Sequence, residues 1–290
     1  MLPLLLFFLA PPQSHDLPAR FAVIAGPSQG KVGIAAALLG TPERAAFHNA
    51  QRFPMQSVYK FPIAMAVLHL VDGGSLSLDQ VVRIARSEMV PAALHSPIRD
   101  QHPEGAAVSL REVLRYAVSE SDGTASDVLL RLAGGPARVT AYLRTLGIRD
   151  LTVATTELEM SRDTRAQYRN WATPDAAVAL LTAFDAGRGL TPASHALLRQ
   201  WMTATATGPA RIKGLLPPGT VVAHKTGTSG TDQGFTAATN DIGLVTLPDG
   251  RRFAIAVFVA DSTADQTVRE RVIAQAAEAA WNHWKVPSPR

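Results

Sequence analysis

Cysteine is absent from the 290-residue sequence, which excludes a disulfide framework, a thiolate metal site and a cysteine nucleophile. The chain also has little excess charge of either sign. Charged residues make up 18% of the chain and the net charge is only +4, without the basic stripe that nucleic-acid-binding proteins carry. The eight histidines include no His-x-His or His-x-x-x-His pair, which disfavours a zinc mechanism. We therefore expect no nucleic-acid partner, no metal and no cofactor.

Long apolar runs are rare as well. The first ten residues, MLPLLLFFLA, fall short of the ~20 residues that span a bilayer. They match the apolar region of a secretory signal, although the usual preceding basic residues are missing. We interpret residues 1–14 as an export signal or its remnant. The alternative is an apolar N-terminal helix that packs on the domain. The sequence thus predicts a periplasmic or secreted protein without stable membrane association.

Apolar segments near both ends of the chain have the composition of buried strands. Residues 32–39 (VGIAAALL) follow a Pro/Gly turn, and residues 44–48 form a candidate hairpin partner. Towards the other end, three further strands and a closing amphipathic helix are predicted at 221–226, 242–247, 253–260 and 268–284.

The middle of the chain, from about residue 57 to 201, has a helical texture. Strands from distant ends of a chain often join one sheet. We therefore predict an α/β (α+β) fold, in which an antiparallel sheet flanked by helices is built from residues 15–50 and 202–290. An all-α domain, residues 51–201, is inserted, and the chemistry is expected in the cleft between the two domains.

The first candidate for chemistry is Ser57-Val-Tyr-Lys60. Serine needs an adjacent base to act as a nucleophile at neutral pH, and at i and i+3 on a helix two side chains share one face. Lys60 is placed to take or relay the Ser57 proton. The same spacing at Ser28 and Lys31 lies in a glycine-rich turn, where no helix aligns the pair, and we treat it as a decoy.

Two further segments carry polar groups in unusual places. Ser121-Asp122-Gly123 follows an apolar helical segment; it is either an ordinary turn or the source of a second hydroxyl. The run His224-Lys-Thr-Gly-Thr228 lies on a predicted strand. A lysine in a buried strand is unusual, and a glycine there allows close approach of a ligand or another backbone. Lys225 supplies a cation and Thr226 a hydroxyl.

Together, Ser-x-x-Lys, Ser-Asp-x and Lys-Thr-Gly in this order form the three-part signature of class A β-lactamases and penicillin-binding proteins. The chain resembles this serine family over nearly its whole length. The resemblance implies the split fold described above, a monomer, and a β-lactam as the small-molecule substrate.

The resemblance also implies roles for particular residues. Ser57 takes the position of the nucleophile, Lys60 of its partner and Ser121 of the proton-shuttling serine. Lys225, Thr226 and Ser121 correspond to the residues that hold the substrate carboxylate, and Gly227 belongs to the same motif. The backbone N–H groups of Ser57 and Thr228 correspond to the oxyanion hole.

A glutamate that activates water distinguishes a lactamase from a penicillin-binding protein, because the acyl-enzyme must be hydrolysed. Glu157 best matches the position of this base, and Glu159 is the rival. The base for acylation, Lys60 or Glu157, stays open. Around Glu157 the sequence departs from the family pattern. Leu158 replaces the usual proline, and Ser161 replaces the asparagine that helps to hold the water.

Thr155 and Asn170 replace the Arg–Asp ion pair that usually clamps this loop. Such a loop, together with Asp127, is similar to the extended-spectrum branch of class A that includes the PER and VEB types. This similarity implies a broad entrance and good cephalosporin turnover.

Three other positions bear on substrate binding. Gly123 replaces the asparagine that binds the acylamide, and His95 aligns with a loop at the cleft mouth. No arginine follows on the strand after Lys225, so Thr226 and Thr228 are the expected substitutes. The interpretation is an exported serine hydrolase of penicillins and cephalosporins. The alternatives are a penicillin-binding DD-peptidase and a β-lactam sensor that stays acylated. A serine esterase or glutaminase with the same fold is a less favoured alternative.

Overall fold

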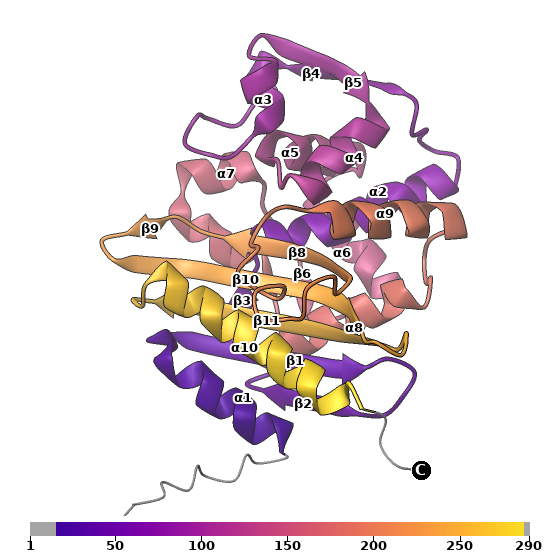
Figure 1. Cartoon of the computed structure of the whole chain (residues 1–290). Coiled ribbons are helices and arrows are strands. Elements are labelled where there is room, and N and C mark those ends of the chain that lie inside the picture. Colours follow the sequence, from indigo (N-terminus) through magenta and orange to yellow (C-terminus); the bar gives the residue numbers. More distant parts are fainter. Residues whose placement is uncertain (1–15, 287–290) are drawn as a thin grey trace, which may run out of the picture.

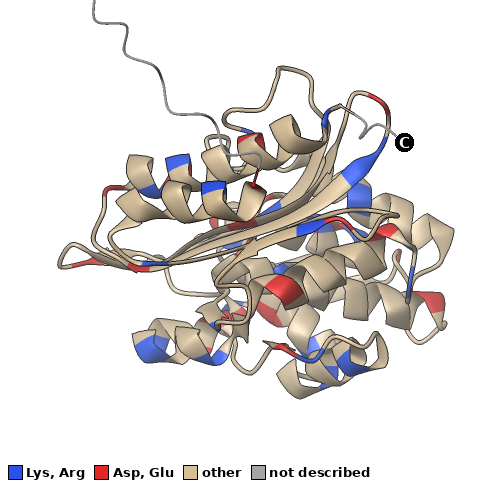
Figure 2. Cartoon of the chain, turned by 90° about the horizontal axis from the view of Figure 1, so that it is seen from below, with Lys and Arg blue, Asp and Glu red and all other residues tan. Residues whose placement is uncertain are grey.

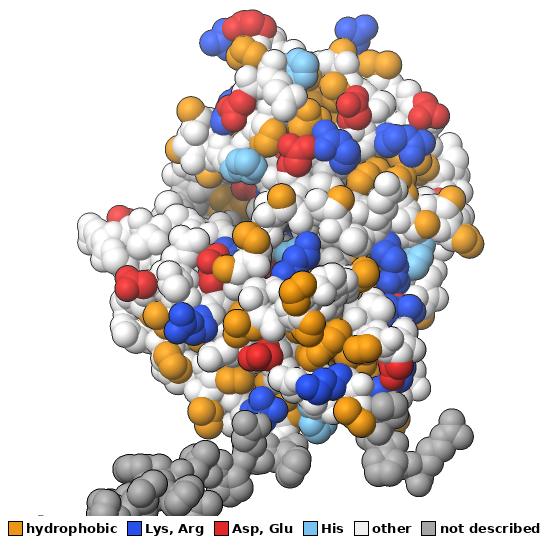
Figure 3. Space-filling model, viewed as in Figure 1, with side chains coloured by type: hydrophobic (Ala, Val, Ile, Leu, Met, Phe, Trp, Pro, Cys, Tyr) orange, Lys and Arg blue, Asp and Glu red, His pale blue; other side chains and the backbone are white. Residues whose placement is uncertain are grey.

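The computed structural model describes residues 16–286 of the chain (Figure 1). The predicted export signal, residues 1–14, lies outside this range. Within the described residues, no helix is both long and apolar enough to cross a membrane. Basic and acidic side chains are interspersed over the face seen in Figure 3.

A six-stranded antiparallel sheet joins the two ends of the chain. Its order is β2-β1-β11-β10-β8, and the short strand β9 also pairs with β10. The register places Val32 opposite Val259 and Ile242 opposite Lys225. The strands are β1 (Lys31–Leu38), β2 (Arg44–Phe47), β8 (Val222–Thr228), β9 (Thr231–Asp232), β10 (Phe235–Thr246) and β11 (Arg252–Ser262).

Helices cover both faces of this sheet, as the view in Figure 2 shows. One face packs against α1 (Leu17–Ala25) and α10 (Gln266–Trp284), and the other against α8 (Pro174–Asp185). Strand β1 is therefore buried along nearly its whole length. This double burial explains why its sequence is an unbroken apolar run instead of alternating with a period of two. The predicted antiparallel sheet flanked by helices is confirmed.

The middle of the chain forms the second layer of the molecule. Its helices include a buried one, α2, whose residues from Lys60 to Leu68 are all enclosed. The helices are α2 (Lys60–Asp72), α3 (Pro97–Gln101), α4 (Leu110–Ser119), α5 (Gly123–Leu132), α6 (Pro136–Thr145), α7 (Glu157–Arg162) and α9 (Pro192–Ala204). Short 3₁₀ segments join them: η2 (Gln56–Tyr59), η3 (Arg86–Glu88) and η4 (Thr164–Arg169), besides η1 (Gly26–Ser28) near the N-terminus.

The middle segment is not purely helical. It also contains a hairpin of β4 (Val81–Ala85) and β5 (Gly105–Ser109), and a small sheet of β3 (Phe53–Pro54), β7 (Trp171–Ala172) and β6 (Leu151–Thr152). The two-residue strands are too short to leave a periodic pattern in the sequence, so the all-α description of this segment was too simple.

Local capping determines where the helices begin. Ser109 accepts a hydrogen bond from the N–H of Glu112 at the start of α4, as the capping pattern predicts. Thr173 caps α8 in the same way, and Pro174 occupies its first position. The closing helix predicted at 268–284 begins two residues earlier, as α10.

Candidate active site

Ser57 lies in the 3₁₀ turn η2, directly before the buried helix α2. The Lys60 Nζ is 2.9 Å from the Ser57 Oγ, so the predicted pair is brought together. The sheet anchors the segment just before this turn, because the Asn240 side chain on β10 donates to the carbonyls of Pro54 and Met55 at 2.8 and 3.2 Å. The nucleophile candidate is thus fixed from two layers of the fold.

The glycine in the Lys-Thr-Gly motif serves this contact between layers. A Cβ at Gly227 would lie 2.2 Å from the carbonyl oxygen of Met55, far inside van der Waals contact. Only glycine lets β8 approach the turn that carries Ser57 this closely. Gly227 does not line the pocket, so its observed role is packing against another backbone, one of the two uses expected for it.

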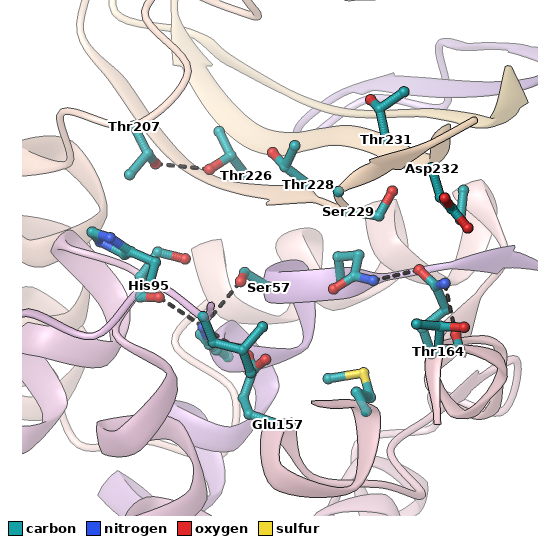
Figure 4. A pocket seen from close by; sticks show the side chains of 18 of the residues that line it. Ser57, His95, Glu157, Thr164, Thr207, Thr226, Thr228, Ser229, Thr231 and Asp232 are labelled. Atoms are coloured by element: carbon teal, nitrogen blue, oxygen red, sulfur yellow. Dashed lines mark hydrogen bonds and ion pairs between the residues drawn. The ribbon is translucent and has the colours of Figure 1, made fainter. Parts of the chain in front are cut away.

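Lys60 bridges the nucleophile candidate and the glutamate. Its Nζ donates to the Ser57 Oγ, to the Ser121 carbonyl at 2.7 Å, and to Glu157 Oε1 in an ion pair of 2.9 Å (Figure 4). The lysine is only 2% exposed. Three acceptors match the three N–H groups of an ammonium, so the buried charge is paired and hydrogen-bonded.

Ser121 connects this group to the sheet. Its Oγ accepts a hydrogen bond from Lys225 Nζ at 2.8 Å, and its backbone has a left-handed φ of 61°. Lys225 is fully buried on β8. Burial holds the pKa of the Lys225 ammonium well below its usual range, and the charge of Lys60 lowers it further. Ser121 thus contacts both lysines, Lys60 through its carbonyl and Lys225 through its hydroxyl.

Glu157 is the first residue of the short helix α7, and it is buried. Asp127 on α5 holds the start of this helix, because its two carboxylate oxygens accept the N–H groups of Glu157 and Leu158 at 2.8 and 2.9 Å. Burial raises the pKa of Asp127 to about 7, and the two backbone hydrogen bonds offset only part of that rise. The Asp127 carboxylate therefore accepts two backbone N–H groups at the start of this helix, in addition to the Thr156 cap.

Glu159, the rival base, is engaged elsewhere. It forms a capping box with Thr156, and its carboxylate accepts hydrogen bonds from the Thr155 hydroxyl and the Thr156 N–H. The hydrogen bond from Thr155 lowers the pKa of the Glu159 carboxyl. The sequence Thr-x-x-Glu carries this signal. Glu157 contacts Lys60, and Glu159 holds the helix terminus.

The loop that carries Glu157 is closed by an uncharged side chain, Asn170, which we call the Asn170 clasp. The family's usual Arg–Asp ion pair is absent at these positions, as the sequence predicts. The Asn170 Oδ1 accepts the N–H groups of Ala154 and Thr155 at 2.7 and 3.0 Å, and its Nδ2 donates to the Thr155 carbonyl at 3.1 Å. Asn170 is fully buried. One amide side chain thus satisfies three backbone groups without any charge.

Arg211 is the functional candidate that sequence reasoning missed. It lies in the loop before β8 and is only 3% exposed. Its guanidinium donates to Thr228 Oγ1 at 2.7 Å, to two strand carbonyls, and to Glu270 on α10 at 3.1 Å. It supplies the cation that was sought on the strand after Lys225. Nothing in its sequence surroundings marks it, because the fold alone brings this loop to β8.

Some of these residues line one pocket of about 670 Å³. Ser57, Glu157, Thr226 and Thr228 lie around it from facing walls, and His95 stands at its rim (Figure 4). The pocket continues beyond Ser57 between η4 and the β9 region.

Four predicted substrate-binding residues do not line the pocket: Lys225, Gly227, Gly123 and Ser161. Gly123 is covered by the His95 segment, whose carbonyl accepts its N–H at 2.9 Å and leaves a Cβ only 3.3 Å of room. Ser161 is exposed, and its hydroxyl donates to the carbonyl of Leu158 in its own helix at 2.8 Å. Met160 lines the pocket in its place. The expected contacts of Gly123 and Ser161 are therefore not formed.

The rejected Ser28/Lys31 pair is also separated in space. The Ser28 hydroxyl faces the carbonyl of Gly30, while Lys31 pairs with Asp261 at the surface. Among residues 16–286, no cluster of three or more His, Cys, Asp or Glu side chains could hold a metal ion.

Comparisons with known proteins identify the family of the chain. The β-lactamase enzyme family matches residues 17–284 of the chain. The extended-spectrum β-lactamase PER-1 of Pseudomonas aeruginosa is 45% identical over 80% of this chain and 75% of its own length. The β-lactamase VEB-1 of the same species is 38% identical over 94% of this chain and 91% of its own.

A solved structure shows the same fold. The class A β-lactamase representative from Bacteroides cellulosilyticus is 31% identical and superimposes with a TM-score of 0.88, covering 94% of this chain and 99% of that one.

Proposed function

The chain belongs to the β-lactamase enzyme family, within class A, and from this premise we propose how its residues hydrolyse β-lactams. The Ser57 Oγ attacks the lactam carbonyl, a bond forms between them, and the C–N bond of the ring breaks. The Ser57 proton passes to Lys60 or Glu157, and Ser121 delivers a proton to the ring nitrogen. The Lys60 Nζ, 2.9 Å from the Ser57 Oγ, supports this assignment.

The substrate carboxylate fits the basic end of the pocket. Arg211 supplies buried positive charge there, Thr226 and Thr228 supply hydroxyls, and Lys225 lies behind the lining against the Ser121 hydroxyl. Charged donors in a water-poor site bind a carboxylate more strongly than neutral ones. The backbone N–H groups of Ser57 and Thr228 are the proposed oxyanion hole, where the negative charge of the tetrahedral intermediate develops.

Glu157 is the proposed general base for deacylation. It removes a proton from the water that attacks the Ser57 ester, and Ser57 leaves with a proton restored. One observation carries this assignment: Lys60 joins the Ser57 Oγ and Glu157 Oε1 at 2.9 Å each. A carboxylate held on the partner of the nucleophile lies close enough to activate a water at the ester.

The test compares two isosteric variants, Glu157→Gln and Glu159→Gln, with a chromogenic cephalosporin and intact-mass detection. We expect wild type and Glu159→Gln to turn over repeatedly, and Glu157→Gln to accumulate an acyl adduct on Ser57. Repeated turnover by Glu157→Gln would refute the assignment of the base. A wild type that stops after one equivalent would instead behave as a penicillin-binding protein or a sensor.

We also propose an extended-spectrum substrate range. PER-1 carries that description, and the long pocket with its uncharged Asn170 clasp supports a broad entrance. A kcat/KM far lower for third-generation cephalosporins than for penicillins would contradict this proposal. Export to the periplasm or medium, and a monomeric state, are proposals as well. Cell fractionation and light scattering of the purified protein test them.

A further inference from the structure

Two charges in the pocket are not engaged with the protein. Among the charged residues of its lining, Lys60 pairs with Glu157, and Arg211 pairs with Glu270. The Arg165 guanidinium and the Asp232 carboxylate also line the pocket, but neither forms a side-chain hydrogen bond or ion pair within the described part of the chain. These two side chains are free to interact with a ligand.

The two free charges lie on facing walls. Arg165 belongs to η4, which follows the Glu157 helix, and Asp232 belongs to β9, beyond the Lys-Thr-Gly strand. Figure 4 shows Asp232 reaching down from β9 towards η4, where Thr164, the neighbour of Arg165, lines the opposite side. Both residues are exposed. They stand at the outer end of the pocket, away from Lys225.

Two other carboxylates near this end are engaged within the protein. Asp261 accepts hydrogen bonds from both Tyr168 and Lys31, and Asp163 accepts the backbone N–H of Arg165. The charge that an incoming group meets at the mouth is therefore set mainly by Arg165 and Asp232.

The placement of the substrate decides which of its groups reaches them. With the reacting carbonyl at Ser57 and the ring carboxylate at Lys225 and Arg211, as proposed above, the acylamino substituent on the other side of the bicyclic nucleus extends in the opposite direction. That direction leads between η4 and β9. A charged group on the acyl side chain thus enters the space between a free cation and a free anion.

We propose that Arg165 is a specificity-determining residue that favours β-lactams with a carboxylate on the acyl side chain, and that Asp232 opposes it. Arg165 presents a planar pair of donors that matches a carboxylate. Asp232 repels the same group, and pulls cationic side chains towards its wall. Both charges act over distances that salt screens.

The experiment uses one oxyimino cephalosporin with a carboxylate on its oxime substituent and the same compound with that carboxylate methylated. The readout is the ratio of their kcat/KM values. We expect Arg165→Gln to lower the acid-to-ester ratio by roughly three- to tenfold, the scale of one partly screened charge pair. Asp232→Asn should raise the ratio, and 1 M salt should lower it in wild type.

Arg162→Gln is the matched control, because Arg162 is an exposed arginine on the same loop that does not line the pocket. Its ratio should equal that of wild type. An unchanged ratio in Arg165→Gln, or an equal fall in Arg162→Gln, would overturn the proposal. Failure of wild type to turn over either compound would instead contradict the proposed catalytic function, so the two outcomes are distinguishable.

Discussion

The two walls of the catalytic pocket are held in place by different means. On the sheet side, Lys225 and Thr226 belong to β8, whose backbone pairs with β10 in continuous register. On the loop side, Glu157 lies on a single short helix that side chains secure: Asp127 at its start, Glu159 in its capping box and Asn170 in the neighbouring clasp.

The difference separates the two halves of the reaction. The groups on β8 that are assigned to carboxylate binding depend on strand pairing, which a single side-chain substitution rarely disrupts. The group assigned to deacylation depends on a few side-chain-to-backbone hydrogen bonds, each of which one substitution removes. We therefore expect variants of the sheet wall to lose binding and acylation, and variants of the loop wall to lose stability and deacylation.

The largest effect is expected on the sheet wall. Lys225→Met keeps the apolar stem but removes the ammonium that contacts Ser121. We expect kcat/KM to fall by about 10²–10³-fold, as for other charged or oriented donors in a desolvated site, with no acyl-enzyme accumulating. Thermal unfolding should change little, because a buried cation is costly to the fold. A loss below tenfold would remove Lys225 from the proposed machinery.

The next effect concerns pH and the loop wall. Burial raises the pKa of Asp127 from its ordinary 3.8 to about 7 in the folded protein, so the folded state binds the proton more tightly than the unfolded state. The stability from this group is fully present below pH about 4 and is lost as pH rises through about 7. At 1.36 kcal/mol per pKa unit, the loss is on the order of 2–4 kcal/mol.

Asp127→Asn isolates this contribution, because asparagine does not titrate. The free energy of unfolding of wild type minus that of the variant should fall between pH 4 and pH 8, as measured by denaturant titration at each pH. A difference that stays constant across this range would show that Asp127 keeps an ordinary pKa in the folded protein.

A somewhat smaller effect is expected from Asn170→Ala, which leaves the buried N–H groups of Ala154 and Thr155 without their acceptor. The expected cost is about 2–3 kcal/mol of unfolding free energy, together with slower deacylation. Differential scanning calorimetry and acyl-enzyme mass measurements check the two parts. The control is Asn282→Ala, at an exposed position on α10. If Asn170→Ala lowered the acylation rate more than the deacylation rate, the distinction between the two walls would be wrong.

The smallest effect is expected where the loop meets the sheet. The Tyr168 hydroxyl on η4 donates to Asp261 on β11 at 2.6 Å, and this contact ties the two walls together. Tyr168→Phe should cost about 1 kcal/mol or less, since the pair is partly exposed. We expect bulky oxyimino cephalosporins to gain relative to small penicillins in kcat/KM. An unchanged ratio would show that the tether does not set the width of the entrance.

The sheet wall and the Ser57 turn could be predicted from the sequence far better than the loop wall. Ser57, Lys60 and Lys225 stand in motifs whose spacing reflects regular elements, and the structure brings them together. The capping pattern at Thr156 and Glu159 also contained the information that separates the two glutamates, because a glutamate used in a capping box is not free to act as a base.

The remaining features depend on contacts between distant segments. Arg211 reaches β8 from a preceding loop, and no local pattern marks it. Ser161 was expected near the water, but its hydroxyl turns to the carbonyl of Leu158. Gly123 takes the sequence position of an acylamide-binding asparagine, but the His95 segment covers it. Side-chain direction in short helices and turns depends on such tertiary packing, which sequence periodicity does not encode.

The pairing of β1 with β11 also governs when activity can arise during synthesis. These strands come from opposite ends of the chain, so β1 has no partner on that side until almost the whole protein has left the ribosome. Contacts of such long sequence separation slow folding, because a large loop must close before they form. A nascent chain that already carries Ser57, Lys60 and Glu157 therefore remains catalytically silent until its last strand arrives.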